Sequence, residues 1–287
     1  MSERLPRLRL NLDFMPSPVP DRPGLLIRDA LGYSDTTMIV PPLLVQCLHL
    51  FDGEGTELDL RKTLVTLTGD LNVGEVVEHL VRSLGQAGFL EDGTYHALRE
   101  ERHREFAESP ARIASRAGSA YPHQADELRA KLSEYLDHNG PGAPIEDLIG
   151  IAAPHVSPEG GRTCYQAAYG ALRPEHKDCT FVVLGTSHYG QSDRFGLTRK
   201  PYVTPLGETG TAVSLVDELA ERAGGGVVME DYCHAVEHSV EFQVLFLQHT
   251  LGAGVKILPV LCGSFGRSLV SGDAPEEDTG VSAFLSA

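Results

Sequence analysis

Two histidines that directly follow apolar runs are the residues best placed to do chemistry. His155 ends the run IGIAAPH, and His188 ends FVVLGTSH. Because a buried strand needs only about four to eight residues, both imidazoles are predicted just beyond the carboxyl end of a strand, where open α/β sheets bind ligands. Neutral imidazole suits zinc, copper and iron. A single histidine beside a strand is more often structural, but a pair at equivalent strand ends favours a metal site.

A third group, Glu237-His238-Ser239-Val240-Glu241, places an imidazole between two carboxylates. If this segment is helical, Glu237 and Glu241 share one face at i, i+4 spacing. A carboxylate that orients His238 would make it a general acid or base near neutral pH, which gives three catalytic candidates. The alternative is ordinary helix-start chemistry, in which glutamate complements the helix dipole and His238 lies on the surface.

Weaker candidates for substrate contact lie in two predicted loops. Tyr202 and Thr204 belong to YVTPLG, where Pro and Gly favour a tight loop, although an ordinary turn explains them equally well. Glu159 precedes two glycines that would let a ligand approach the backbone. Neighbouring Cys233 and His234 are the weakest candidates.

The elements that must position these residues alternate in the second half of the chain. Apolar runs predict strands, and helical periodicity predicts helices, in the order expected of a layered α/β domain. The predicted strands are 148–153, 179–184 and 256–261, and the predicted helices are 163–172, 213–223 and 237–251.

The first half predicts a separate small α+β unit. Residues 25–41 offer two short β segments, and helices follow over 41–51, 57–67 and 73–85. A helix over 94–109 is charged nearly all round, which suits an exposed connection, and Pro110 ends it. We therefore expect two domains, 1–110 and 111–287.

Composition restricts the partners. The 287 residues carry a formal net charge of −16, which repels nucleic acid and anionic membranes. The sequence has no secretory core and no membrane-length apolar stretch. Five scattered cysteines suggest no disulfide framework. We expect a cytoplasmic protein that binds neither nucleic acid nor membrane; its oligomeric state is left open.

Several motifs, taken in order, resemble the Memo family. They are PHVSPEGG with His155, LGTSHYG with His188, YVTPLGE, VEHSVEFQ with His238, and ILPVLCGSF, preceded by RAGSAYP. This version is similar to the bacterial and archaeal branch called AmmeMemoRadiSam system protein B, and the resemblance covers roughly residues 111–287.

The resemblance implies the fold of class III extradiol dioxygenases, which are non-haem iron enzymes. It implies metal ligation by His155 and His188, with iron first and copper or zinc as alternatives, and an acid/base role for His238. The family's third ligand follows a later strand, and nothing after Cys262 matches it, since Asp273 is followed by no His or Cys. Either the chain is a fragment that lacks this strand, so that the domain is incomplete at its C-terminal end, or this copy cannot complete the site; we expect the incomplete domain, and no third ligand is found in this chain.

The first domain resembles PqqD-like winged-helix modules. That resemblance implies peptide binding by addition of a strand to a sheet edge. Residues 1–110 hold 11 Lys/Arg and 18 Asp/Glu, a balance that favours peptide or protein over DNA.

Two hypotheses follow. In the first, the protein is a metal-dependent, dioxygenase-like redox enzyme of a radical-SAM-associated modification system. In the second, it is a non-catalytic peptide- or protein-binding protein that uses the winged-helix domain and the Memo-like cleft.

Overall fold

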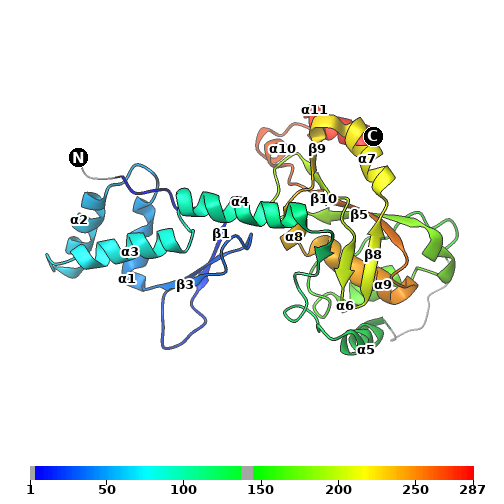
Figure 1. Cartoon of the computed structure of the whole chain (residues 1–287), viewed down its shortest axis with the longest axis horizontal. Helices are drawn as coiled ribbons and strands as arrows, with labels where there is room; N and C mark the ends of the chain where they lie inside the picture. Colours follow the sequence, from blue (N-terminus) through cyan, green and yellow to red (C-terminus); the bar gives the residue numbers. More distant parts are fainter. Residues whose placement is uncertain (1–3, 137–144) are drawn as a thin grey trace. The chain divides into compact units, whose positions relative to one another are not determined.

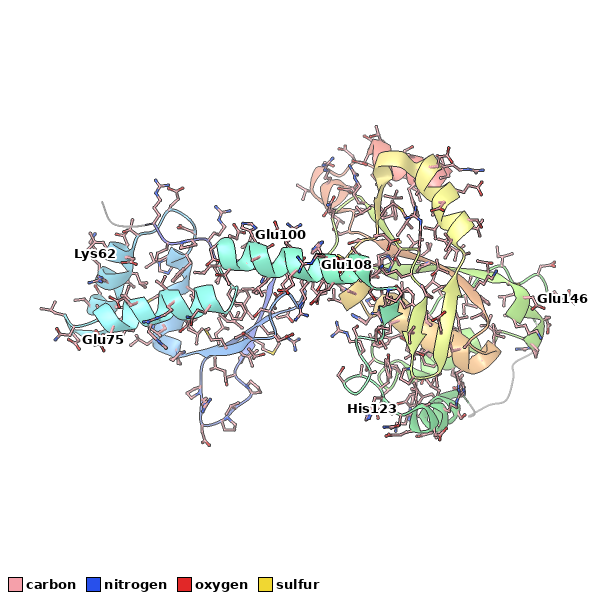
Figure 2. The ribbon with its side chains drawn as sticks, in the orientation of Figure 1. Lys62, Glu75, Glu100, Glu108, His123 and Glu146 are labelled. Carbon is pink, nitrogen blue, oxygen red and sulfur yellow. The ribbon has the colours of Figure 1, made fainter. Side chains whose placement is uncertain are left out.

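The computed structural model describes residues 4–136 and 145–287, which divide into two compact units. Unit 1 is Met1–Glu105 and unit 2 is Phe106–Ala287 (Figure 1). The division falls inside helix α4 (Gly93–Glu108), close to the boundary expected near residue 110. Glu100 and Glu108 project into solvent from α4 (Figure 2), as its charged sequence predicts.

Unit 1 combines a small antiparallel sheet with helices. The sheet order is β1-β2-β3, comprising Leu12–Pro16, Leu25–Asp29 and Thr37–Val40. The helices are α1 (Pro42–Val45), α2 (Glu57–Thr68) and α3 (Gly74–Gln86), with a 3₁₀ turn at Leu48–Leu50. The single helix expected over 41–51 is thus wrong, because it is split into α1 and the 3₁₀ turn. Strand β1 was not predicted.

The core of unit 1 is built from the apolar stripe of α3. Val77, Leu80 and Leu84 are buried in one hydrophobic cluster together with Leu60 and Leu64 of α2. The i, i+3, i+4 spacing that predicted the helix is therefore the spacing that packs it.

Unit 2 is organised around one central strand, β10 (Lys256–Cys262). β10 pairs in parallel with β5 (Thr180–Thr186) along its whole length. On its other side β10 pairs in parallel with β8 (Gly207–Thr211) and antiparallel with β6 (Phe195–Leu197). The sheet is completed by β4 (Arg112–Ile113), β7 (Tyr202–Thr204) and β9 (Val227–Met229) in the order β4-β7-β8-β10-β6-β9.

Helices cover both faces of β10, because its alternate side chains enter two different cores. Ile257 and Leu261 belong to a cluster with residues of α5 (Ala125–Leu136), α6 (Arg162–Tyr169) and α9 (Ser239–Leu251). Leu258 and Val260 belong to a second cluster, with residues of α7 (Val213–Ala223) and α11 (Thr279–Ser286). Two short helices, α8 (Cys233–Val236) and α10 (Gly266–Ser271), complete unit 2. The α/β fold class is confirmed.

The segment from Tyr202 to Gly207 is the tight β7–β8 hairpin, so of the two alternatives the ordinary turn holds there. Two expected elements differ from the structure. Residues 148–153 run without regular structure instead of forming a strand, because no described strand pairs with them. The helix expected over 237–251 begins at Ser239. The turn that the segment NGPGAP (139–144) predicts lies outside the described residues. In the part of the chain that the structure describes, no helix has the length and apolar character needed to span a bilayer.

Candidate metal site

Three histidines from distant parts of the sequence converge in unit 2. His155, His188 and His238 each offer one ring nitrogen, and these nitrogens all lie within 4.8 Å of one another. The ring centroids of His188 and His238 are 4.9 Å apart, and those of His155 lie 5.2 and 5.8 Å from them. The two histidines at predicted strand ends are therefore brought together, with His238 beside them.

A close contact between β5 and the start of α9 brings His188 and His238 together. A Cβ at Gly185 would lie 2.6 Å from Ser239 Oγ and 2.7 Å from Val240 Cγ2, so only glycine permits this approach. Ser239 Oγ donates a hydrogen bond of 2.8 Å to the carbonyl of Thr186. His188 follows β5 by two residues, and His238 is the N-cap of α9. The packing of the helix start on the strand therefore sets the separation of their rings.

The buried carboxylate of Glu237 positions the imidazole of His188. Its carboxylate accepts a hydrogen bond from the backbone N–H of His188 and lies 2.8 Å from His188 Nδ1. Glu237 is 2% exposed, whereas the His188 side chain is 35% exposed. A carboxylate behind Nδ1 favours the tautomer with its proton on that nitrogen, which leaves Nε2 free as a ligand. Glu237 thus positions an imidazole, although not on a shared helical face with Glu241.

The surroundings of His238 favour the neutral form, which is the form that a metal ligand requires. Burial and the neighbouring imidazoles of His188 and His155 lower the pKa of His238. Glu237 Oε2 lies 3.9 Å from His238 Nδ1, farther than from His188. The carboxylate therefore orients His188 rather than His238.

Glu237 and His238 lie at the break between α8 and α9. Two arginines stabilise this break. Arg112 donates to the carbonyls of His234 and Glu237, each at 2.7 Å, and Arg116 donates to the carbonyl of Val236 at 2.8 Å. A helix end leaves carbonyls without intrahelical partners, and burial makes an unpaired carbonyl costly. These guanidinium groups satisfy them. Sequence reasoning missed both arginines; their nearest signal was the RAGSAYP motif, in which Arg116 is the first residue.

Glu241 belongs to a buried network away from the three histidines. Its carboxylate accepts hydrogen bonds from Arg112, from Tyr121 and from the backbone N–H of Ser115 at 2.9 Å. Burial alone would raise the pKa of Glu241, but Arg112 and the hydrogen bonds lower it overall. Burial, with Glu241 next to it, raises the pKa of Tyr121. The prediction that Glu237 and Glu241 flank His238 on one helix is therefore wrong, because Glu237 caps α8 and lies before α9.

The weaker candidates lie elsewhere. Tyr202 is buried in β7 and lies 2.7 Å from His234 Nδ1, and Thr204 donates a hydrogen bond to Gln248 Oε1. Burial lowers the pKa of His234 to about 4. Glu159 is exposed in the loop before α6. Tyr202 and Thr204 therefore face protein partners in a strand, instead of a substrate in a loop.

The donor set fits a divalent metal. Three imidazoles suit zinc, copper and iron, and zinc–nitrogen bonds are about 2.0–2.1 Å long. Two nitrogens on one ion are thus at most about 4.2 Å apart, which is close to the 4.8 Å within which the three histidine nitrogens lie. From the sequence, His155 and His188 could be assigned as ligands, and no residue could be assigned to the family's third ligand position. In the structure a ring nitrogen of His238 lies within 4.8 Å of one on each of the other two histidines.

A cavity of about 360 Å³ lies beside His155. Its walls are residues 151–153, the β5 residues Phe181–Thr186 and side chains of α9, including Gln243. Gln243 donates to the carbonyls of Pro154 and Ser239 and accepts from Tyr169, so its amide is fully engaged. Of the three histidines, His155 is the one that lines this cavity.

An α/β domain with three histidines gathered past the end of a strand defines a candidate metal-binding protein. Comparison with known families assigns it further: the family described as Memo-like protein matches residues 112–271. The chain therefore belongs to the Memo family, as its motifs predicted. The resemblance of unit 1 to PqqD-like modules stays a prediction.

Similar proteins carry the same family name. A MEMO1 family protein of Aquifex aeolicus is 29% identical over 237 residues, covering 82% of this chain and 62% of the relative. MEMO1 family proteins of Methanococcoides burtonii and Archaeoglobus fulgidus are 30% and 32% identical over 148 residues. Each of these matches covers 51% of this chain, and 53% and 52% of the two relatives respectively. The aligned part thus spans between about half and three fifths of these relatives.

Proposed function

We propose that unit 2 binds one divalent metal ion through His155, His188 and His238 and uses it in redox or Lewis-acid chemistry. The observation that carries this proposal is the convergence of three imidazoles from three separate segments. Three neutral ligands leave the charge of the ion uncompensated and coordination positions open, so the ion would supply Lewis-acid or redox chemistry. Iron is the first candidate, because the motifs resemble a branch with a dioxygenase-like fold; copper and zinc are alternatives.

The residues around the site have distinct tasks in this proposal. Glu237 fixes the tautomer of His188, and apolar side chains such as Val183 and Leu247 form part of the hollow beside His155. A substrate that filled this hollow would displace water from it and strengthen electrostatic interactions there. The similarity to AmmeMemoRadiSam system protein B supports a setting in a radical-SAM-associated modification system, in the cytoplasm.

The role of His238 is decided by one experiment. The full chain and its His155→Ala, His188→Ala and His238→Ala variants are loaded with Fe²⁺, Cu²⁺ or Zn²⁺, and bound metal is measured by elemental analysis. If all three histidines are ligands, each substitution lowers the affinity at least about tenfold. If His238→Ala retains metal like the wild type, His238 is an acid/base residue instead. Wild-type protein without near-stoichiometric metal refutes the metal proposal.

A second candidate function is peptide docking by unit 1. Strand β3 is an edge strand, and no described strand pairs with its outer side. An edge with unpaired N–H and C=O groups is a template for strand addition. Peptide arrays probed with the full chain test this function; an Ile39→Pro substitution, which removes a backbone donor from β3, should abolish binding. Binding that survives Ile39→Pro would contradict docking at this edge.

A further inference from the structure

The segment that carries His155 has no regular structure. Within the described chain, no backbone group of residues 151–156 forms a hydrogen bond with another backbone group. The imidazole of His155 contacts the rings of His188 and His238, but among the described residues it forms no hydrogen bond. The ring of His188, by contrast, has the carboxylate of Glu237 beside its Nδ1. The position of His155 must therefore be set by something other than its own ring or a strand.

Two side chains bind the carbonyl groups of the residues on either side of His155. Gln243 Nε2 donates a hydrogen bond of 3.0 Å to the carbonyl of Pro154, and Tyr165 Oη donates one of 2.9 Å to the carbonyl of Val156. Gln243 belongs to α9 and Tyr165 to α6. The residues before and after His155 are thus tied to two helices, which limits the movement of the residue between them.

Gln243 is itself held in one orientation. Tyr169 Oη donates a hydrogen bond of 2.8 Å to Gln243 Oε1, and Gln243 Nε2 also donates one of 3.1 Å to the carbonyl of Ser239. Carbonyl oxygens only accept, so the amide NH₂ must face them. Tyr169 and Tyr165 are buried, and their rings stack on Phe246 with centroids 5.0 and 4.2 Å away. Both hydroxyls therefore project from a packed aromatic core.

Close packing against the start of α6 holds the same segment. A Cβ at Gly161, the N-cap of α6, would lie 2.8 Å from Val156 Cγ2 and 3.1 Å from Pro154 Cγ. Glycine therefore lets the neighbours of His155 approach this helix closely. The hydrogen bonds and this contact act on the same two residues.

We propose that Gln243 and Tyr165 are positioning residues, which place His155 at the metal site through the backbone on either side of it. Their role rests on the proposed function, because it is the ion that requires His155 at this place. Gln243 has a further effect: Ser239, whose carbonyl it binds, is the first residue of α9 and follows His238 directly. One amide thus connects the backbone beside His155 with the backbone beside His238.

Gln243→Met in the full chain removes the donated hydrogen bonds and keeps an unbranched side chain of similar length. Its Zn²⁺ affinity, measured by calorimetric titration, should fall about tenfold, the lower end of the range for loss of a partner that orients a ligand. Gln166→Met is the matched control, because Gln166 of α6 donates instead to the carbonyl of Leu136 in α5. It should bind zinc as the wild type does.

A double-mutant cycle separates positioning from a general structural role. If Gln243 acts through His155, Gln243→Met should change the zinc affinity by less than about twofold in a chain that already carries His155→Ala, because coupled residues are not additive. An equal loss in both backgrounds overturns the proposal. Tyr165→Phe removes only a hydroxyl and should weaken zinc binding about threefold. It tests the second hydrogen bond even if Gln243→Met does not fold, and unchanged affinity would overturn the role of Tyr165.

NMR of the metal-free protein distinguishes failure of this proposal from failure of the metal site. Cross-relaxation between ring protons of His155 and His188, whose centroids are 5.2 Å apart, should appear in the wild type and in Gln166→Met. It should be lost in Gln243→Met, and its retention there overturns the proposal. A wild type that shows the cross-relaxation but binds no metal refutes the proposed function, whereas its loss in Gln243→Met still supports the positioning of His155.

Discussion

Replacing Glu237 with glutamine isolates the effect of the buried carboxylate on the metal site. The wild-type carboxylate accepts from both the backbone N–H and the Nδ1 of His188. A glutamine has one acceptor oxygen, so its amide NH₂ would face one of these donors. The ring of His188 then loses its fixed orientation and its preference for a proton on Nδ1, while the size of the side chain is retained.

The expected loss of metal affinity is about 10- to 100-fold, the range found when a partner behind a ligating histidine is removed. This corresponds to about 1.4–2.7 kcal/mol of binding free energy. The assay is calorimetric titration of the full chain with Zn²⁺ against a competing chelator at neutral pH. Glu159→Gln is the matched control, because Glu159 is exposed in the loop that follows His155. It should bind metal as the wild type does.

Two results would refute this reasoning. One is a folded Glu237→Gln protein whose zinc affinity stays within about threefold of the wild type. The other comes from nitrogen-15 NMR of the metal-free wild type: the proton of His188 should reside on Nδ1, and a proton on Nε2 would contradict the assignment of the ligand atom.

Three further outcomes are expected. Burial lowers the pKa of His234 to about 4, below its unfolded value, so stability is lost as pH falls from about 6.5 towards 4, by up to about 1.4 kcal/mol per pH unit; urea unfolding should show this slope, and His234→Gln should flatten it. Arg112→Leu leaves a buried carboxylate uncompensated and should cost about 3–5 kcal/mol in the same assay, whereas Arg222→Leu, from an exposed pair, should cost less than about 1 kcal/mol. Gly185→Ala would put a Cβ 2.6 Å from Ser239 Oγ and should cost about 1–3 kcal/mol; metal titration should also show weaker binding, and unchanged affinity would disconnect this packing from the site.

Much of the fold was predictable because periodicity reports burial directly. The helix over 213–223 has the predicted bounds, and the strand over 256–261 differs by one residue. The run 148–153 shows the limit of this method. Its apolar residues are typical of a buried strand, yet a strand also needs a neighbour to pair with, and apolar character carries no information about that neighbour.

The approach of His155 and His188 could be predicted because both follow apolar runs, although only His188 follows an observed strand, β5. The position of His238 depends on a break between two helices, and Arg112, more than a hundred residues earlier, stabilises that break. Such a tertiary hydrogen bond leaves no local pattern, so the segment was interpreted as one continuous helix.

The dependence of the α8–α9 break on Arg112 bears on how the protein can be dissected. Arg112 stands near the very beginning of unit 2, among the residues an investigator would most readily trim as linker. A shortened version that starts after it would keep all three histidines of the cluster and yet lose the hydrogen bonds that hold the backbone next to His238. Fragments intended for metal studies should therefore start at Phe106 or earlier. A shorter fragment that binds no metal would not show that the histidines are not ligands.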